Sequence, residues 1–177
     1  MKNPKKILIA NRGVIAIRAL RAAKELGYEV ASVYSTVDKD QKHLKLSDEA
    51  ICIGPATAKD SYKNDAAIIA AAELVGADAV YPRFGFLAEN ASFEEKCKES
   101  GFEFVGPDSK VIEVMGDKIK AKKLIESLGV PTVPGYTGKI ESQNQIESKV
   151  EQIGYPVIVK ASSGGGGRGM RLSLIHI

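Results

Sequence analysis

The amino-terminal half of the chain alternates short apolar runs with segments of helical periodicity. Residues 6–10 and 29–34 are apolar runs, and between them residues 14–26 repeat apolar side chains at helical spacing before Gly27. The pattern continues with predicted strands at 50–53, 79–81 and 102–105 and predicted helices at 66–75 and 92–99. Strands that alternate with helices indicate a parallel sheet with helices on both faces. We therefore predict an α/β fold with a Rossmann-like parallel sheet.

Two loops follow the carboxyl ends of predicted strands, residues 11–13 and 82–89. The carboxyl ends of parallel strands meet at one edge of the sheet, where ligands bind in folds of this class. We expect both loops to lie at that edge.

The second half of the chain has a different organisation. Gly106 and Pro107 interrupt the alternation, and predicted helices follow at 110–128 and 143–152, with a strand at 157–160. We predict three segments: a first domain over 1–112, the start of a second domain over 113–172, and an atypical tail over 173–177. A unit as small as the second one buries a low fraction of its surface, which limits its stability.

A run of four glycines, 164–167, follows the strand that ends at Lys160. Ordering glycine is entropically costly, so the run needs a compensating role. Backbone without Cβ atoms can approach a phosphate closely and surround it with N–H groups, and Lys160 and Arg168 add positive charge. We predict a phosphate-binding flap; an exposed hairpin loop or a linker is the alternative.

Two common phosphate-binding motifs are absent from the sequence, and the spacing of Lys118 does not by itself indicate a binding role. No GxxxxGK[ST] occurs and no GxGxxG follows the first strand, which disfavours a P-loop NTPase and a standard dinucleotide enzyme. Lys118, judged by spacing alone, resembles a solvated helix face with its neighbours Lys120, Lys122 and Lys123.

Composition excludes several functions. The net charge of +3 is too small to indicate nucleic acid, and the aromatic content of 6% without Trp argues against base stacking. No segment is long and apolar enough to span a membrane, so we expect a cytoplasmic location. Cys52 and Cys97 form no CxxC motif, and we expect both in apolar surroundings; His43 is expected to be a surface or packing residue.

Several motifs in order along the chain resemble biotin carboxylase, the ATP-grasp subunit of acetyl-CoA carboxylase and related enzymes. The resemblance runs from about residue 6 to about residue 172 and rests on IANRG at 9–13, IAIR at 15–18, DEAICIGP at 48–55, GFLAEN at 85–90, MGDK at 115–118, GVP at 129–131, VPG at 133–135 and GYPVIVKA at 154–161. It implies a Rossmann-like domain followed by an incomplete ATP-grasp domain. The chain resembles the amino-terminal part of the family.

The resemblance also implies site residues. Lys118 and Lys160 match lysines that contact ATP phosphates, and Met170 matches a residue packed near the adenine. Gly165, Gly166 and Gly167 match the glycine-rich lid. No catalytic residue or metal ligand of the family falls within the chain, because the ligands of Mg²⁺, the bicarbonate site and the base come later in the family pattern. We therefore expect the 177-residue chain to be inactive alone.

In intact relatives, ATP activates bicarbonate as carboxyphosphate, and biotin on a carrier protein is then carboxylated. The resemblance implies biotin carboxyl carrier protein, carboxyltransferase and a second copy of the chain as partners. Arg18 and Arg21 are either part of the subunit interface or solvated.

The chain departs from the family pattern at several positions. Val14 stands where the family has an acidic residue at a helix start, Arg83 replaces a glycine, and Phe84 lacks a tyrosine hydroxyl. Arginine would be strained if that glycine has a positive φ. Residues 173–177 do not continue the family sequence and are interpreted as a truncation or cloning artefact.

Two alternatives stay open. Another ATP-grasp ligase, such as a carbamoyl phosphate synthetase or a glycinamide-type ligase, is disfavoured by residues 11–13 and 85–90. The second alternative is a non-catalytic module that folds, self-associates or binds nucleotide weakly.

Overall fold

The computed structural model describes residues 5–138, 140–161 and 169–174. The chain divides into two compact units, residues 1–113 and 114–177.

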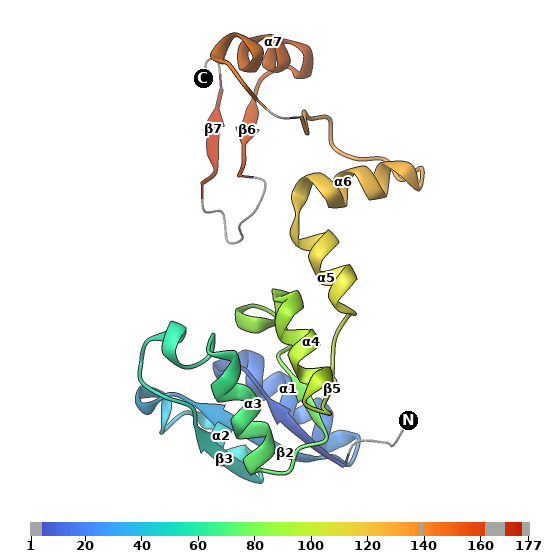
Figure 1. The fold of residues 1–177 in the computed structure, drawn as a ribbon. Helices are drawn as coiled ribbons and strands as arrows, with labels where there is room; N and C mark the ends of the chain where they lie inside the picture. Colours follow the sequence, from blue (N-terminus) through green and yellow to red (C-terminus); the bar gives the residue numbers. More distant parts are fainter. Residues whose placement is uncertain (1–4, 139, 162–168, 175–177) are drawn as a thin grey trace. The chain divides into compact units, whose positions relative to one another are not determined.

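The first unit is built on a five-stranded parallel sheet. Its strands are β1 (Lys6–Ile9), β2 (Glu29–Tyr34), β3 (Glu49–Cys52), β4 (Ala79–Tyr81) and β5 (Glu103–Phe104), in the order β3-β2-β1-β4-β5 (Figure 1). All five strands were predicted from the sequence. The parallel α/β fold is confirmed.

Helices cover both faces of the sheet, as predicted. They are α1 (Gly13–Glu25), α2 (Lys42–Leu46), α3 (Asp65–Leu74) and α4 (Ala91–Glu99), with short 3₁₀ helices η1 (Thr36–Asp38), η2 (Ala58–Asp60) and η3 (Phe86–Glu89). Successive side chains of a strand point to opposite faces. Leu8 therefore packs in one core with residues of α3 and α4, while Ile7 and Ile9 pack in another with α1. The segment from η1 to α2 was not predicted.

Side chains of Asn residues fix where two of these helices begin. The Asn64 side chain accepts a hydrogen bond from Ala67 N at 3.2 Å, and the Asn90 side chain accepts one from Phe93 N, also at 3.2 Å. Each bond satisfies one of the amide groups that a helix leaves without a partner at its amino end.

The described part of the second unit contains two helices and a strand pair, and α5 (Ser109–Gly116) runs across the boundary between the units. Helix α6 (Lys118–Ser127) is capped by Asp117, and α7 (Gln143–Ile153) is capped by Ser142. Strands β6 (Val157–Val159) and β7 (Arg171–Ser173) pair in antiparallel fashion. Among the described residues of this unit, the buried hydrophobic side chains are Val150 and Val157.

The expectation for the two cysteines was correct for Cys97 and wrong for Cys52. Cys97 is buried, and burial raises the pKa of its thiol to about 12. Cys52 is exposed because β3 is an edge strand of the sheet.

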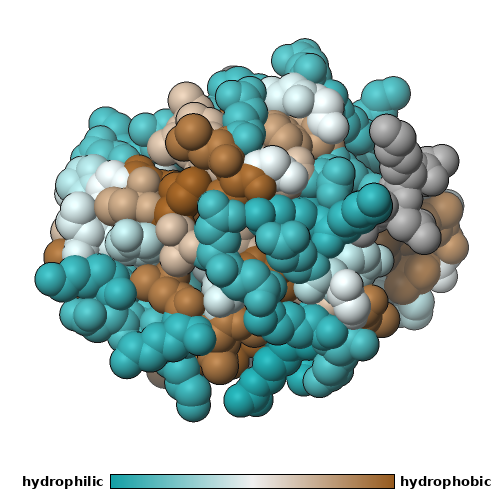
Figure 2. Space-filling view, turned by 90° about the horizontal axis from the view of Figure 1, so that it is seen from below, coloured by the Kyte–Doolittle hydropathy of each residue, from teal (hydrophilic) through white to brown (hydrophobic). Residues whose placement is uncertain are grey.

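Figure 2 shows one face on which hydrophilic side chains predominate and hydrophobic groups lie between them. Within the described ranges, no helix has the length and apolar character needed to cross a bilayer.

Candidate functional site

Two loops meet at the carboxyl edge of the sheet, as the strand order requires. The buried Asn11, just after β1, donates from Nδ2 to the carbonyl oxygens of Pro82 at 2.8 Å and Phe84 at 3.0 Å, just after β4. Strands β1 and β4 are neighbours, and the chain proceeds from β1 toward β2 but later from β4 toward β5. This reversal is the topological position at which ligands bind in open parallel sheets. The sequence prediction about these loops is confirmed.

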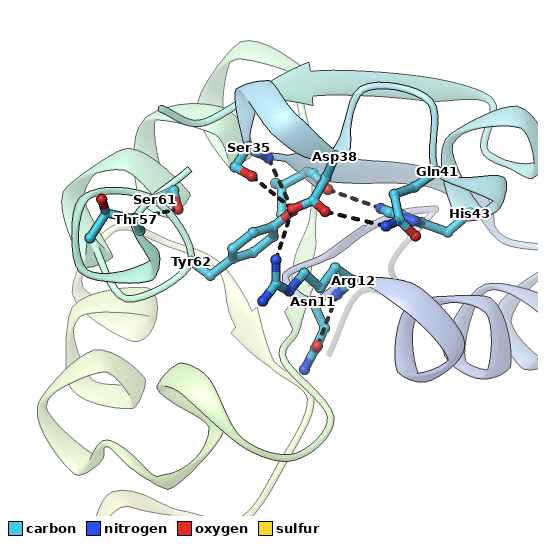
Figure 3. A network of polar contacts seen from close by, with 10 residues as sticks. Asn11, Arg12, Ser35, Asp38, Gln41, His43, Thr57, Ser61 and Tyr62 are labelled. Atoms are coloured by element: carbon cyan, nitrogen blue, oxygen red, sulfur yellow. Dashed lines mark hydrogen bonds and ion pairs between the residues drawn. The ribbon is translucent and has the colours of Figure 1, made fainter. Parts of the chain in front are cut away.

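A buried carboxylate organises the same edge. Figure 3 shows Ser35, Tyr62 and Arg12 directed toward Asp38. The Asp38 carboxylate accepts hydrogen bonds from Ser35 Oγ at 2.7 Å, Tyr62 Oη at 2.8 Å and Arg12 Nη1 at 3.1 Å. Burial raises the pKa of Asp38, but the three donors together outweigh burial and hold the pKa below its ordinary 3.8. The carboxylate is therefore the charged form at neutral pH.

Aromatic rings extend this network to the loop after β4. The Arg12 guanidinium lies 5.1 Å from the ring centroid of Tyr62 and 5.7 Å from that of Phe86, and the two rings stack at 5.1 Å. Burial raises the pKa of Tyr62 to about 12, so its hydroxyl stays protonated and donates to Asp38. Sequence reasoning missed Ser35, Asp38 and Tyr62, because no short motif signals contacts between loops that are distant in the sequence.

The loop after β4 contains two residues in the left-handed region. Arg83 has φ 64° and Phe86 has φ 49°. Such a conformation costs of order 1 kcal/mol or more for a residue with a side chain. From the sequence we expected strain at Arg83 if the backbone at this position has a positive φ, and the φ is positive. The Arg83 guanidinium lies 5.7 Å from the ring centroid of Phe84, which is 57% exposed.

The start of α1 also lies at this edge and has no negative charge. Arg12 is its N-cap residue, no side chain caps the helix, and its first turn contains no acidic residue. Val14, where the resemblance led us to expect an acidic residue, is 81% exposed. The first turn of α1 therefore supplies no charge of its own to offset the positive end of the helix dipole.

The predicted nucleotide contacts lie in the second unit. Lys160 follows β6 and Met170 precedes β7, one step beyond the paired Val159 and Arg171, so both lie at the same end of the hairpin. Lys160 is exposed and Met170 is 38% exposed. Lys118 is the exposed first residue of α6, a different element. The predicted lid residues Gly165, Gly166 and Gly167 lie outside the described residues.

Metal-binding groups and histidine give no further site in the described ranges. Over residues 5–138, 140–161 and 169–174, no group of three or more His, Cys, Asp or Glu side chains could hold a metal ion. His43 is a packing residue: its ring is buried, and Nε2 lies 3.2 Å from the carbonyl oxygen of Val33.

Comparison with known proteins gives two matches of family models. Residues 3–112 match "Biotin carboxylase, N-terminal domain", and residues 117–174 match "Carbamoyl-phosphate synthase L chain, ATP binding domain". The biotin carboxylase of Haemophilus influenzae is 55% identical over 168 residues, which cover 94% of this chain and 38% of that protein.

Solved structures agree with these matches. A biotin carboxylase from Campylobacter jejuni, solved as a complex with β,γ-ATP, matches with a TM-score of 0.91 and 48% identity over 98% of this chain and 39% of its own. The biotin carboxylase domain dimer of 2-oxoglutarate carboxylase from Hydrogenobacter thermophilus, crystallised with MgADP, ADP and bicarbonate, matches with a TM-score of 0.89 and 45% identity over 98% and 38% of the chains. The chain thus spans less than two fifths of the length of these relatives.

Proposed function

Because the chain belongs to the biotin carboxylase N-terminal domain family, we propose that it forms the amino-terminal part of an ATP-dependent biotin carboxylase. The observation that carries the proposal is the succession of two family matches, at 3–112 and 117–174, in one continuous alignment with biotin carboxylases. The proposed activity of the intact enzyme is carboxylation of carrier-bound biotin by bicarbonate, with ATP consumed through carboxyphosphate. We propose that the 177-residue chain alone does not catalyse it.

We propose that the β6–β7 hairpin binds the nucleotide. Lys160 and Lys118 are the proposed phosphate contacts, Gly165, Gly166 and Gly167 the lid, and Met170 the neighbour of the adenine. The pairing of β6 with β7 supports this assignment, since it carries Lys160 and Met170 to one end of the hairpin. A lysine ammonium and main-chain N–H groups can together neutralise and position a triphosphate.

Mg²⁺ would supply further charge neutralisation to the transferred phosphoryl group. The described residues offer no group of side chains that fits the ion. We therefore assign no metal ligand to this chain and derive no step through the metal.

The proposed partners are a biotin carboxyl carrier protein, a carboxyltransferase and a second copy of the chain. Homodimer formation is supported by the dimeric biotin carboxylase domain of Hydrogenobacter thermophilus. The exposed Arg18 and Arg21 on α1 are candidates for that interface. We propose a cytoplasmic location, in keeping with the bacterial relatives.

Calorimetric titration with Mg-ATP tests the nucleotide site. We expect heat of binding in the unmodified chain and its loss in Lys160→Ala. Lys123→Ala removes an exposed lysine of α6 in the same unit and is the matched control, which should leave binding unchanged. No ADP release is expected on addition of biotin and bicarbonate.

The absence of any heat with Mg-ATP would favour the alternative, a folded module without nucleotide binding. One observation favours that alternative: the described part of the second unit buries few hydrophobic side chains.

A further inference from the structure

Helix α2 is fixed to the first unit through a single buried residue, His43. Of the five residues of α2, all of them described, His43 is buried, and Leu46 is partly buried against the core on the α1 side of the sheet. An isolated helix of this length is not stable in water, so α2 depends on its packing. The attachment of α2 therefore rests on a titratable ring.

The two ring nitrogens of His43 have different surroundings. Nε2 lies 3.2 Å from the carbonyl oxygen of Val33. A carbonyl oxygen can only accept, so Nε2 carries the proton of the neutral ring and Nδ1 carries the lone pair. Nδ1 is buried and has no hydrogen-bond partner within the described residues. A second proton on this ring would therefore be a buried N–H without an acceptor, which is a costly arrangement.

The chain is held firmly on both sides of α2. Before the helix, the Asp38 carboxylate accepts hydrogen bonds from Ser35 and Tyr62. After the helix, Asp48 N donates to the Val30 carbonyl oxygen, and the Asp48 carboxylate accepts from Val30 N, each at 2.9 Å. Strand β2 keeps its neighbours β1 and β3 whether or not α2 is in place. An opening between these two anchors therefore leaves the sheet intact.

Charged groups face α2 from η1, from α1 and from the start of β3, and α2 itself adds two. They are Asp38, Arg21, Lys24, Glu25, Asp48, Lys42 and Lys45. Hydrogen bonds hold the pKa of Asp38 and of Asp48 below the ordinary 3.8, so both stay ionised in mild acid. Lysine and arginine are cationic throughout that range. His43 is thus the group there whose ordinary pKa, 6.5, lies in the mildly acidic range.

We propose that His43 is a pH-sensitive latch: when the ring gains a proton in mildly acidic solution, residues 41–47 detach from the sheet while the rest of the first unit stays folded. The new proton goes to Nδ1, and the charged ring is stable only where water reaches it. Asp38 does not serve as the acceptor, because its oxygens already accept from other donors, among them Gln41 Nε2 at 3.3 Å (Figure 3).

The latch also controls a surface groove. Lys42 and Leu46 of α2 form one wall of the groove, and Leu20 and Arg21 of α1 lie on the other. Detachment of α2 removes the first wall and changes the surface around Arg21. Under the proposed function, Arg21 is a candidate for the subunit interface, so association of two copies should weaken in mild acid. This consequence rests on the proposed function, whereas the latch itself does not.

Amide hydrogen exchange of the ¹⁵N-labelled chain, followed by nuclear magnetic resonance, tests the latch. The Ser47 amide donates to the His43 carbonyl oxygen at 3.1 Å and reports on α2, and the Val75 amide donates to Ala71 at 3.1 Å and reports on α3. After correction for the intrinsic effect of pH on exchange, we expect the protection of Ser47 to fall by up to about tenfold for each pH unit below 6.5, because opening binds one proton. Ser47 should be less protected than Val75 and respond little to low concentrations of urea, because a local opening exposes little surface.

Two variants assign the effect to one ring. His43→Gln retains a donor for the Val33 carbonyl oxygen and does not titrate, so it should remove the pH dependence at Ser47. His176→Gln removes the other histidine of the chain and should leave that dependence intact. If His43→Gln does not fold, the ring signals of His43 in the unmodified chain provide the test: the gain of the proton should coincide with the loss of protection at Ser47.

Three results would overturn the proposal. The first is Ser47 protected as strongly as Val75 at every pH. The second is a pH dependence at Ser47 that survives in His43→Gln. The third is a His43 ring that gains its proton while the protection of Ser47 stays constant. The exchange measurements contain no nucleotide and no partner, so their failure is distinct from failure of the proposed function.

Discussion

At the scale of single residues, Asp38 connects three segments through one buried carboxylate. Replacing it by asparagine keeps the shape but removes the charge and one acceptor oxygen, so Ser35 and Tyr62 can no longer both donate to an anion. We expect Asp38→Asn to lower the free energy of unfolding by about 2–3 kcal/mol, measured by urea denaturation. The ion pair with Arg12 contributes little to this loss of free energy, because the Arg12 side chain is 41% exposed and water screens its charge.

Asp40→Asn is the matched control for this change. Asp40 is exposed, and it lies two positions further along the chain. The control should unfold within about 0.5 kcal/mol of the unmodified chain. Equal losses in the two variants would contradict a special role for Asp38.

His43 makes stability depend on pH in the mildly acidic range. Burial lowers the pKa of His43 below its ordinary 6.5, outweighing the hydrogen bond to Val33 and the charge of Asp38, which raise it. Between the lowered pKa of His43 in the folded chain and its ordinary value of 6.5, the unfolded chain binds a proton that the folded chain does not. The contribution of the neutral ring is therefore complete above pH 6.5 and is lost as the pH falls below that value.

We expect the free energy of unfolding to fall between about pH 7.5 and about pH 5.5, measured in urea at each pH. His43→Gln should flatten this dependence. His176→Gln removes the other histidine of the chain and should leave the dependence intact. A slope that persists in His43→Gln would assign it to another group.

At the scale of secondary-structure elements, α1 begins without the negative charge that favours a helix start. Val14 occupies the second position of the helix and is mostly exposed. We expect Val14→Glu to stabilise the chain by about 0.3–1 kcal/mol through the helix dipole. Thermal unfolding at low and high salt measures the gain, which should shrink as salt screens it. Val14→Gln introduces a side chain of the same shape as glutamate but without its charge, and it should show no salt-dependent gain in stability.

The elements that the sequence predicted are those with strong local patterns. The five strands and the helices α1, α3 and α4 follow from apolar periodicity and glycine punctuation, and the structure has all of them. Helix α2 was missed because its five residues are too few to show a period. Cys52 was misplaced because periodicity does not say which strand lies at the sheet edge.

The candidate site was predictable in part. The meeting of loops 11–13 and 82–89 followed from parallel topology, and the consequence of a positive φ at Arg83 followed from elementary sterics. The convergence of Ser35, Asp38 and Tyr62 did not, because their contacts are set by tertiary packing. The nucleotide roles of Lys118 and Lys160 stay predictions.

At the scale of the whole molecule, the hydrophobic core is unevenly distributed between the two units. The first unit buries two clusters, one on each face of its sheet. In the described part of the second unit, exposed hydrophobic side chains such as Leu128, Val133 and Leu172 outnumber the buried ones. Since burial of apolar surface is the main favourable term in folding, the second unit should open at a lower free energy than the first.

Limited digestion with trypsin measures this difference. Lysine and arginine occur in both units, so differences in cleavage rate report on structure and not on the supply of sites. We expect cleavage first within residues 114–177 and a resistant product close to residues 1–113 in mass spectra. Equal rates of cleavage in the two units would contradict the predicted difference in stability.

Mg-ATP extends the same experiment to function. A ligand that binds the folded form stabilises it in proportion to the logarithm of its concentration. Under the proposed function, Mg-ATP should slow cleavage within the second unit, and Lys160→Ala should abolish this protection while Lys123→Ala retains it. Cleavage of the first unit should not change in any of the three proteins, because its two cores lie within residues 1–113. If the protection persisted in Lys160→Ala, the nucleotide would bind at a site other than the β6–β7 hairpin.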